Sequence, residues 1–426
     1  MKHIFRSTKA YTPTKVMAAG LLAVGMLAPT AASAGTLVDA VKNGTPLINL
    51  RYRYENVDMD GMSKEAHANT LRSRIGYQTD WWQDLQAMVE FENITVIGEE
   101  NYNDTLNGKA RPIVADPEDT ELNQGFVVFR GIKDTTLKVG RQRIKVMNDR
   151  FVGNVGFRQN EQTFDSVLLV NTSIPNLTAV YSYVWNVNRI FGNDSPTGDL
   201  NTNTHWGHLS YKTPLGALTA YGLSIDLDHQ NGGALAGLST TTFGARFAGD
   251  YEVLDGLKAL YAFDYAHQSD QGDNPADYSV DYYLIEPGLS FAGLTGKLGY
   301  EVLGSDWTNA FQTPLATLHA FQGATDVFLV TPARGIQDAY TKLSYKVANM
   351  GAFDDTVLSF MYHDFNSEAG HTNYGTEWDI KIGRKFKTDY GTISLAAEYA
   401  DFNADNDSGM GYVDVQKTWL TVGVAY

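Results

Sequence analysis

The sequence of 426 residues contains no cysteine. This absence excludes disulfide bonds, thiolate zinc sites and cysteine nucleophiles. It also suits an exported protein that crosses an oxidising compartment before it folds. Any chemistry must therefore come from oxygen ligands, imidazole rings and guanidinium groups.

Long apolar runs are absent as well. Beyond residue 34 no stretch approaches the ~18 consecutive apolar residues that indicate a membrane-spanning helix. The chain nevertheless contains 24 Tyr, 20 Phe and 7 Trp, although its mean hydropathy is only −0.26. A polar average with many aromatic residues is typical of a transmembrane β-barrel, whose strands alternate apolar outward and polar inward side chains between two aromatic girdles.

The first 34 residues have the pattern of a secretory signal peptide. An apolar stretch covers residues 16–27, and the small residues Ala32, Ser33 and Ala34 precede Gly35. A retained membrane anchor is the alternative, but this stretch is shorter than the ~20 residues of a spanning helix. The sequence therefore predicts a cleavable signal over residues 1–34 and a barrel domain over residues 35–426. The basic residues that open the signal are Lys2, Arg6, Lys9 and Lys15.

Basic residues are scarce in the predicted mature chain, which has 29 Lys and Arg against 49 Asp and Glu, a formal charge of −20. This balance argues against nucleic acid as a partner. No G-x-S-x-G, G-x-G-x-x-G or P-loop pattern occurs, so we predict neither an enzyme nor a cofactor. His205 and His208 would point to opposite faces of a strand, and the loop 401–407 lacks the Gly and Glu of a calcium loop. We therefore predict no metal site.

Alternation with a period of two residues recurs along the whole mature chain. In one segment Tyr221, Leu223, Ile225 and Leu227 alternate with small or polar residues, and we expect this apolar set to face lipid. Such segments predict an all-β chain of eighteen antiparallel strands. They begin near Leu47, Ala68, Leu85, Glu121, Thr135, Gln162, Asn176, Asn203, Ala217, Ser239, Asp255, Tyr278, Gly293, Gly335, Asp354, Tyr374, Gly391 and Asp414.

The connectors between these segments alternate in length. Tight ones cover residues 212–216, 291–293 and 387–391, whereas long ones cover residues 97–120, 144–161, 186–203 and 304–334. Short periplasmic turns and long extracellular loops are typical of transmembrane barrels, and an even strand number lets the sheet close without an exposed edge. A β-sandwich would show no such alternation. Sixteen and twenty strands are the nearest alternatives to eighteen.

The final strand ends in an alternating signature. Leu420, Val422, Val424 and the terminal Tyr426 occupy every second position up to the carboxylate. This pattern resembles the C-terminal signature of outer-membrane proteins that the barrel-assembly machinery recognises, although an ordinary half-buried strand could also show it. We therefore expect the assembly machinery to be a partner during biogenesis.

Arginine is distributed unevenly, with ten of fifteen arginines between residues 51 and 158. Arg51 and Arg53 share one strand face, and Arg72 and Arg74 share a face of the next predicted strand. Each arginine would cost about 2–4 kcal/mol if it faced lipid at mid-bilayer, so these four should line the lumen. They predict either an anion-attracting pathway or a structural network in which they pair with Glu55, Glu90 and Glu92. The complete candidate set for the pore lining is Arg51, Arg53, Arg72, Arg74, Arg130, Arg141, Arg143, Arg150 and Arg158.

The predicted strand from Thr135 is ambiguous, because Leu137 and Val139 share parity with Arg141 and Arg143. A bulge near Gly140 would turn both arginines into the lumen, which is the arrangement we expect.

Four segments of this region carry a family resemblance: residues 140–144, 148–153, 157–160 and 163–165, which read GRQRI, NDRFVG, FRQN and TFD. They resemble the central motif block of the alginate-export family of outer-membrane barrels. The resemblance extends from about residue 50 onward and implies an eighteen-stranded barrel with an arginine-rich pore for an anionic polyuronate. By motif position it implies pore roles for Arg141, Arg143, Arg158 and Arg150.

Together these patterns predict an outer-membrane porin of a Gram-negative bacterium that passes small hydrophilic, anionic solutes by diffusion. An export or uptake channel for an anionic polysaccharide such as alginate is one alternative. A surface receptor or adhesin with a blocked lumen is another. The expected partners are outer-membrane lipid, lipopolysaccharide and small solutes, and the oligomeric state is left open between monomer and homotrimer.

Overall fold

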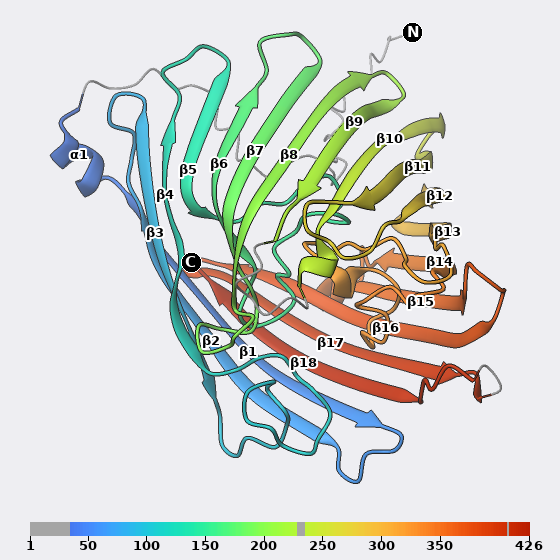
Figure 1. Ribbon diagram of the computed structural model, residues 1–426. Coiled ribbons are helices and arrows are strands. Elements are labelled where there is room, and N and C mark those ends of the chain that lie inside the picture. The colour runs from blue at the N-terminus through green and yellow to red at the C-terminus, as the bar shows by residue number, and fades with distance from the viewer. Residues whose placement is uncertain (1–34, 228–234, 407–408) are drawn as a thin grey trace, which may run out of the picture.

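The computed structural model describes residues 35–227, 235–406 and 409–426. The predicted signal peptide, residues 1–34, lies outside the described residues. Within these ranges eighteen strands form one antiparallel sheet that closes where β1 pairs with β18, and Figure 1 shows them as a tilted ring. Closure satisfies the backbone hydrogen bonds that a strand edge would leave unmet in lipid. The predicted fold class and strand number are thereby confirmed.

The helices and strands have the following bounds. A short helix, α1 (Leu37–Lys42), precedes the barrel, and 3-10 helices cover Ala236–Leu238, Leu318–Ala320 and Gly351–Phe353. The strands are β1 (Thr45–Met59), β2 (Ala66–Gln78), β3 (Leu85–Val96), β4 (Asp119–Phe129), β5 (Thr135–Gln142), β6 (Thr163–Asn171), β7 (Leu177–Asn188), β8 (Asp199–Thr213), β9 (Gly216–Ile225), β10 (Thr240–Leu254), β11 (Leu257–Asp270), β12 (Ser279–Phe291), β13 (Leu294–Leu303), β14 (Ile336–Lys346), β15 (Val357–Asn366), β16 (Asn373–Thr388), β17 (Gly391–Ala404) and β18 (Val415–Ala425).

The strand starts agree closely with the predicted ones. The largest difference is four residues, at β8, which was predicted from Asn203 and begins at Asp199. The first residues of β8 are mostly polar and gave no apolar alternation. The connectors alternate as expected: residues 214–215, 255–256, 292–293 and 389–390 form tight turns at one end, and residues 97–118, 143–162 and 304–335 form long connectors at the other. Because both ends of the described chain lie at the end of the barrel with the tight turns, they are on the periplasmic side.

The outer wall of the barrel is apolar. Ile75, Phe243 and Leu298 are each more than 60% exposed on it, and inward neighbours such as Glu301 are buried. A wall of this kind is stable only against lipid, because it would otherwise be a large apolar surface in water. No helix of the described residues is long and apolar enough to cross a membrane.

The prediction that the apolar face of the segment 221–227 meets lipid is wrong. Tyr221, Leu223 and Ile225 point into the barrel and are at most 5% exposed, whereas Leu218 on the alternate face of β9 is 51% exposed. Leu227, just beyond β9, is equally buried. The alternation was read correctly, but period two defines two faces without saying which one meets lipid. The apolar set faces inward here because the lumen contains apolar partners.

These partners come from two long connectors that fold into the barrel. The connector 143–162 supplies Phe151, whose ring packs 5.2 Å from that of Tyr221 and 5.5 Å from that of Tyr282, measured between centroids. The connector 304–335 supplies Phe311, 6.1 Å from Phe151. The two connectors also pair directly, since Gly153 N donates to Leu315 O at 2.9 Å. One side of the lumen is therefore a packed apolar core.

Candidate functional site in the lumen

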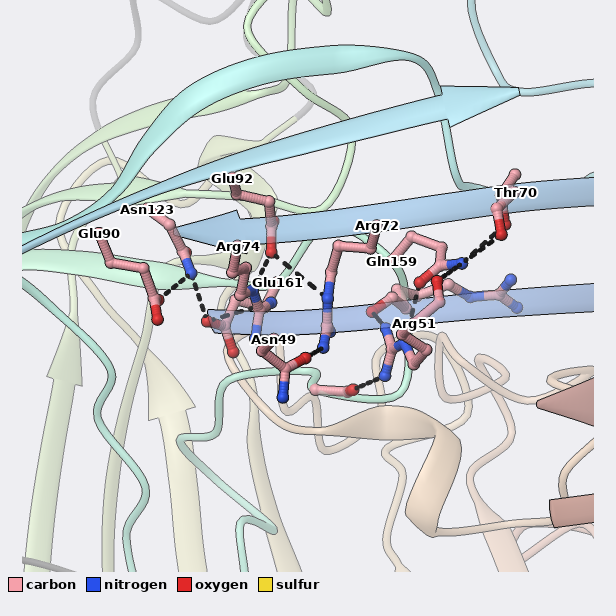
Figure 2. Close-up of polar contacts among 12 residues, drawn as sticks. Asn49, Arg51, Thr70, Arg72, Arg74, Glu90, Glu92, Asn123, Gln159 and Glu161 are labelled. Carbon is pink, nitrogen blue, oxygen red and sulfur yellow. Dashed lines mark hydrogen bonds and ion pairs between the residues drawn. The ribbon is translucent and has the colours of Figure 1, made fainter. Parts of the chain in front are cut away.

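The site is built on the inner face of β1 and β2, where four arginines form a row. Arg51 and Arg72 are cross-strand partners, and Arg53 and Arg74 lie opposite Thr70 and Asn49. Arg53, Arg72 and Arg74 are buried and Arg51 is partly buried. Figure 2 shows Arg74 near Glu92 and Glu161 at one end of the row, and Arg51 near Gln159 at the other.

At the Arg51 end the partners are uncharged. Arg51 donates to the Gln159 side-chain oxygen and to Gly156 O, both at 2.8 Å, and also to Arg158 O. Arg53 donates to Phe157 O at 2.5 Å and lies over the Phe157 ring, 4.1 Å from its centroid. The tip of connector 143–162 is thus held against the barrel wall, because its backbone carbonyls accept hydrogen bonds from Arg51 and Arg53. Among the described residues neither arginine makes an ion pair, although Asp116 and Glu55 act on Arg53 electrostatically.

At the Arg74 end the partners are carboxylates. Arg74 pairs with Glu92 and, at 3.2 Å, with Glu161 of connector 143–162. Arg143 pairs with Glu161 and, at 2.6 Å, with Glu90. Burial alone would raise the pKa of Glu161, but the cations Arg74 and Arg143 lower it to about 2. This end is therefore the structural network that the sequence left open as one of two interpretations.

Two further arginines of the connector are fully paired. Arg158 contacts Glu55 and Asp326 at 3.0 Å each and Asp116 at 3.8 Å. Arg150 contacts Glu301 on β13 at 2.8 Å inside the apolar core. These pairs fix the connector to both sides of the barrel and to the second inward connector.

Arg141 does not line the lumen as predicted. Within the described ladders β5 pairs with both neighbours without a register shift, so the expected bulge at Gly140 does not form. Arg141 lies opposite Gly125, which in turn lies opposite the exposed Val89 of the outer wall. Cross-strand partners share a face, so Arg141 points outward. It is tolerated there because Asp165 accepts hydrogen bonds from it at 2.8 and 3.1 Å.

Arg130 also lies apart from the row. It follows β4 in the periplasmic connector 130–134, and its guanidinium lies 4.6 Å from the centroid of the Trp81 ring. The candidate set is thus divided: seven of the nine arginines meet inside the barrel, whereas Arg130 and Arg141 do not join them.

A belt of cross-strand partners completes the site. Five residues on neighbouring strands are successive cross-strand partners and form this belt: Lys385 on β16, Ser394 on β17, Gly423 on β18, Arg51 on β1 and Arg72 on β2. These residues line a cavity of about 190 Å³ whose lining contains no carboxylate. Arg72 is 5% exposed and donates from Nη2 to Asn49. Its Nε lies 3.9 Å from the Glu92 carboxylate and has no hydrogen-bond partner among the described residues.

The sequence reasoning missed Lys385, Ser394 and Gly423. Along β16 the apolar Ile380 and Ile382 alternate with Asp379 and Lys381. Continuing this period of two residues would have placed Lys385 on the polar, inward face. The predicted closure places the last strands beside β1, but the register that brings Lys385 into one cross-strand row with Arg51 is set by the folded sheet.

The predicted assembly signal lies on the outer face of β18. Leu420, Val422 and Val424 are exposed there, and Tyr426 is 64% exposed beyond the strand. The Tyr426 N–H donates to Ile48 O at 2.9 Å, which joins the chain end to β1. Its recognition by the assembly machinery stays a prediction.

The closed barrel, its apolar outer wall and its polar inner row define a transmembrane β-barrel of the outer-membrane type. No family model matches the chain, and no curated protein matches it by sequence. Among solved structures it is similar to OccK9 (OpdG) of Pseudomonas aeruginosa, at 13% identity and a TM-score of 0.71 over 91% of this chain and 100% of that one. It is also similar to Pseudomonas aeruginosa OpdK with vanillate, at 12% identity and a TM-score of 0.70 over 91% and 99%. At these identities the likeness establishes the shared fold.

No group of three or more His, Asp or Glu side chains in the described part of the chain is arranged to hold a metal ion.

Proposed function

We propose that this protein is an outer-membrane porin through which small anionic solutes diffuse, and that carboxylates bind transiently at the belt of Arg51, Arg72 and Lys385. The observation that carries the proposal is the cavity with three basic side chains and no acidic one in its lining. A guanidinium offers paired N–H donors that match the two oxygens of a carboxylate. Inside a narrow pore such charges are poorly screened, so they select by sign.

The size of this cavity favours a small solute. A volume of about 190 Å³ is below the ~300–1,000 Å³ typical of pockets for drug-sized ligands. An extended polyuronate such as alginate would have to displace the inward connectors, which are fixed by buried ion pairs. A compact aromatic acid of the kind bound in the OpdK structure, vanillate, fits the proposal better. We therefore rank polysaccharide transport below small-anion diffusion.

The test is single-channel recording of the purified protein in a planar lipid bilayer. We expect ohmic current steps, and we expect added vanillate to interrupt them, because its carboxylate occupies the belt. The amide of vanillic acid is the matched neutral control, since it keeps the ring and lacks the charge. It should leave the open time unchanged.

Two results would contradict the proposal. Absence of current from protein that is verifiably folded would favour a receptor or adhesin with a blocked lumen. Equal interruption by the acid and the amide would show that the pore binds the ring without regard to charge.

A further inference from the structure

The helix α1 lies on the outside of the barrel. Tyr77 on β2 donates its hydroxyl to Val41 O, and Asp80 N donates to Ala40 O at 2.9 Å. Tyr77 shares its strand face with Ile75, which is 63% exposed on the lipid-facing wall. Figure 1 shows α1 outside the ring of strands. The helix is therefore held to the outer wall at its periplasmic end.

The large apolar side chains of α1 all point one way. At about 100° per residue, Leu37, Val38 and Val41 fall within an arc of about 100°. They are 53%, 58% and 50% exposed, and we call them the apolar arc of α1. Ala40 is turned toward the barrel and is 4% exposed. Asp39 lies on the side away from the arc.

The start of the helix is fixed, and with it the direction of the arc. Thr36 is the N-cap: its hydroxyl accepts from Asp39 N at 3.2 Å, and the Asp39 carboxylate accepts from Thr36 N at 2.9 Å. Such a capping box satisfies N–H groups that the first turn would otherwise leave free. The exposed aliphatic residues are thus part of an ordered helix.

We propose that the apolar arc of α1 is seated in the periplasmic leaflet of the membrane, at the boundary between phospholipid head groups and acyl chains. The arc continues the lipid-facing wall, because α1 is hydrogen-bonded to Tyr77, which lies on the same outer face of β2 as Ile75. Short amphipathic helices commonly lie at this depth with their apolar face buried. The exposed Lys42 in the last turn can extend its ammonium group toward lipid phosphates.

Neighbouring residues are of the kind found at membrane interfaces. Trp81 and Trp82 follow β2 in the connector 79–84, the same connector whose Asp80 N–H binds α1. Tryptophan is enriched at the head-group level because its ring is apolar and its N–H is polar. A lipid occupant therefore suits the arc better than a soluble protein would.

The experiment uses the absence of cysteine from the whole chain. Val38→Cys is labelled with a nitroxide, and the protein is reconstituted into vesicles of phosphatidylethanolamine and phosphatidylglycerol. Collision rates are measured with oxygen, which concentrates in lipid, and with a water-soluble nickel complex. Ile75→Cys is the lipid reference, Ile113→Cys in the extracellular connector is the water reference, and Asn43→Cys, at the exposed C-cap of α1, tests the side opposite the arc without removing the capping box. Heat-modifiable mobility on a gel verifies that each variant is folded.

We expect the label at Val38 to collide more with oxygen than with nickel, as at Ile75, and the label at Asn43 to show the reverse, as at Ile113. A Val38 label with the water pattern would overturn the proposal. So would a Val38 label shielded from both reagents, which would indicate a protein occupant such as a second copy of the chain. Neither readout depends on ion conduction, so this test is independent of the proposed porin function.

Discussion

Arg51 and Arg74 occupy the same inner wall, yet they have opposite surroundings. Arg51 contacts the side-chain oxygen of Gln159 and two backbone carbonyls, all uncharged. Arg74 contacts the carboxylates of Glu92 and Glu161. The guanidinium is ordered in both cases, but only at Arg51 does its charge remain available to the lumen.

The sequence posed a choice between an anion pathway and a structural network. The Arg74 end of the row is a structural network, and we propose the anion pathway for the Arg51 end. Carbonyl oxygens hold a guanidinium in place through hydrogen bonds without cancelling its charge. Removing an arginine from the paired end should therefore affect folding, and removing one from the belt should affect selectivity.

The largest expected effect is a loss of unfolding free energy in the variant Arg158→Met. This change removes the cation shared by Glu55, Asp116 and Asp326. Breaking a buried pair from one side costs about 3–5 kcal/mol, because charges remain buried without a partner. The free energy of unfolding is measured with denaturant in detergent micelles. Arg51→Met is the control, and its loss should be only about 1–2 kcal/mol because its partners are neutral. Equal losses of unfolding free energy in Arg158→Met and Arg51→Met would contradict the difference drawn between arginines paired with carboxylates and arginines with neutral partners.

A smaller effect is expected for Glu161→Gln. This substitution keeps the shape of the side chain but leaves Arg74 and Arg143 with less negative charge around them. The free energy of unfolding should fall by about 2 kcal/mol, and the zero-current potential in a salt gradient should move toward anion preference. Asp306→Asn is the control, since an exposed extracellular carboxylate is screened by salt within about 8 Å. An unchanged potential in Glu161→Gln would mean that the paired end does not face the ion pathway.

The smallest expected effect is on the stability of the folded protein at acidic pH. The pKa of Glu161 is about 2 in the folded protein, below the ordinary value of about 4.3 for an unfolded chain. A lowered carboxyl pKa stabilises the folded state above the unfolded value, and the stabilisation is lost as the pH falls toward the folded one. We therefore expect the wild type to lose stability between about pH 4.5 and 2 more steeply than Glu161→Gln does. Parallel unfolding curves over this range would show that Glu161 is not held ionised by its neighbours.

The strands and their order could be predicted because period-two alternation and connector length are local properties. The direction of a face is not local, as the segment 221–227 shows: it faces inward because Phe151 and Phe311, distant in sequence, enter the lumen. The arginines of β1 and β2 were placed correctly, since lipid exposure would be costly. Arg141 was not, because the carboxylate that neutralises it, Asp165, lies on the neighbouring strand in a register that only the folded sheet defines. The belt could not be predicted either, because the register that aligns Lys385 with Arg51 across β17 and β18 is defined only by the folded sheet.

The most direct test is the zero-current potential of the triple variant Arg51→Gln, Arg72→Gln and Lys385→Gln in a potassium chloride gradient. The matched control is Arg74→Gln with Glu92→Gln, which removes one charge of each sign from the paired end. We predict anion preference in the wild type and in the control, and its loss in the triple variant. A triple variant that keeps the wild-type potential would contradict the assignment of ion selectivity to the belt.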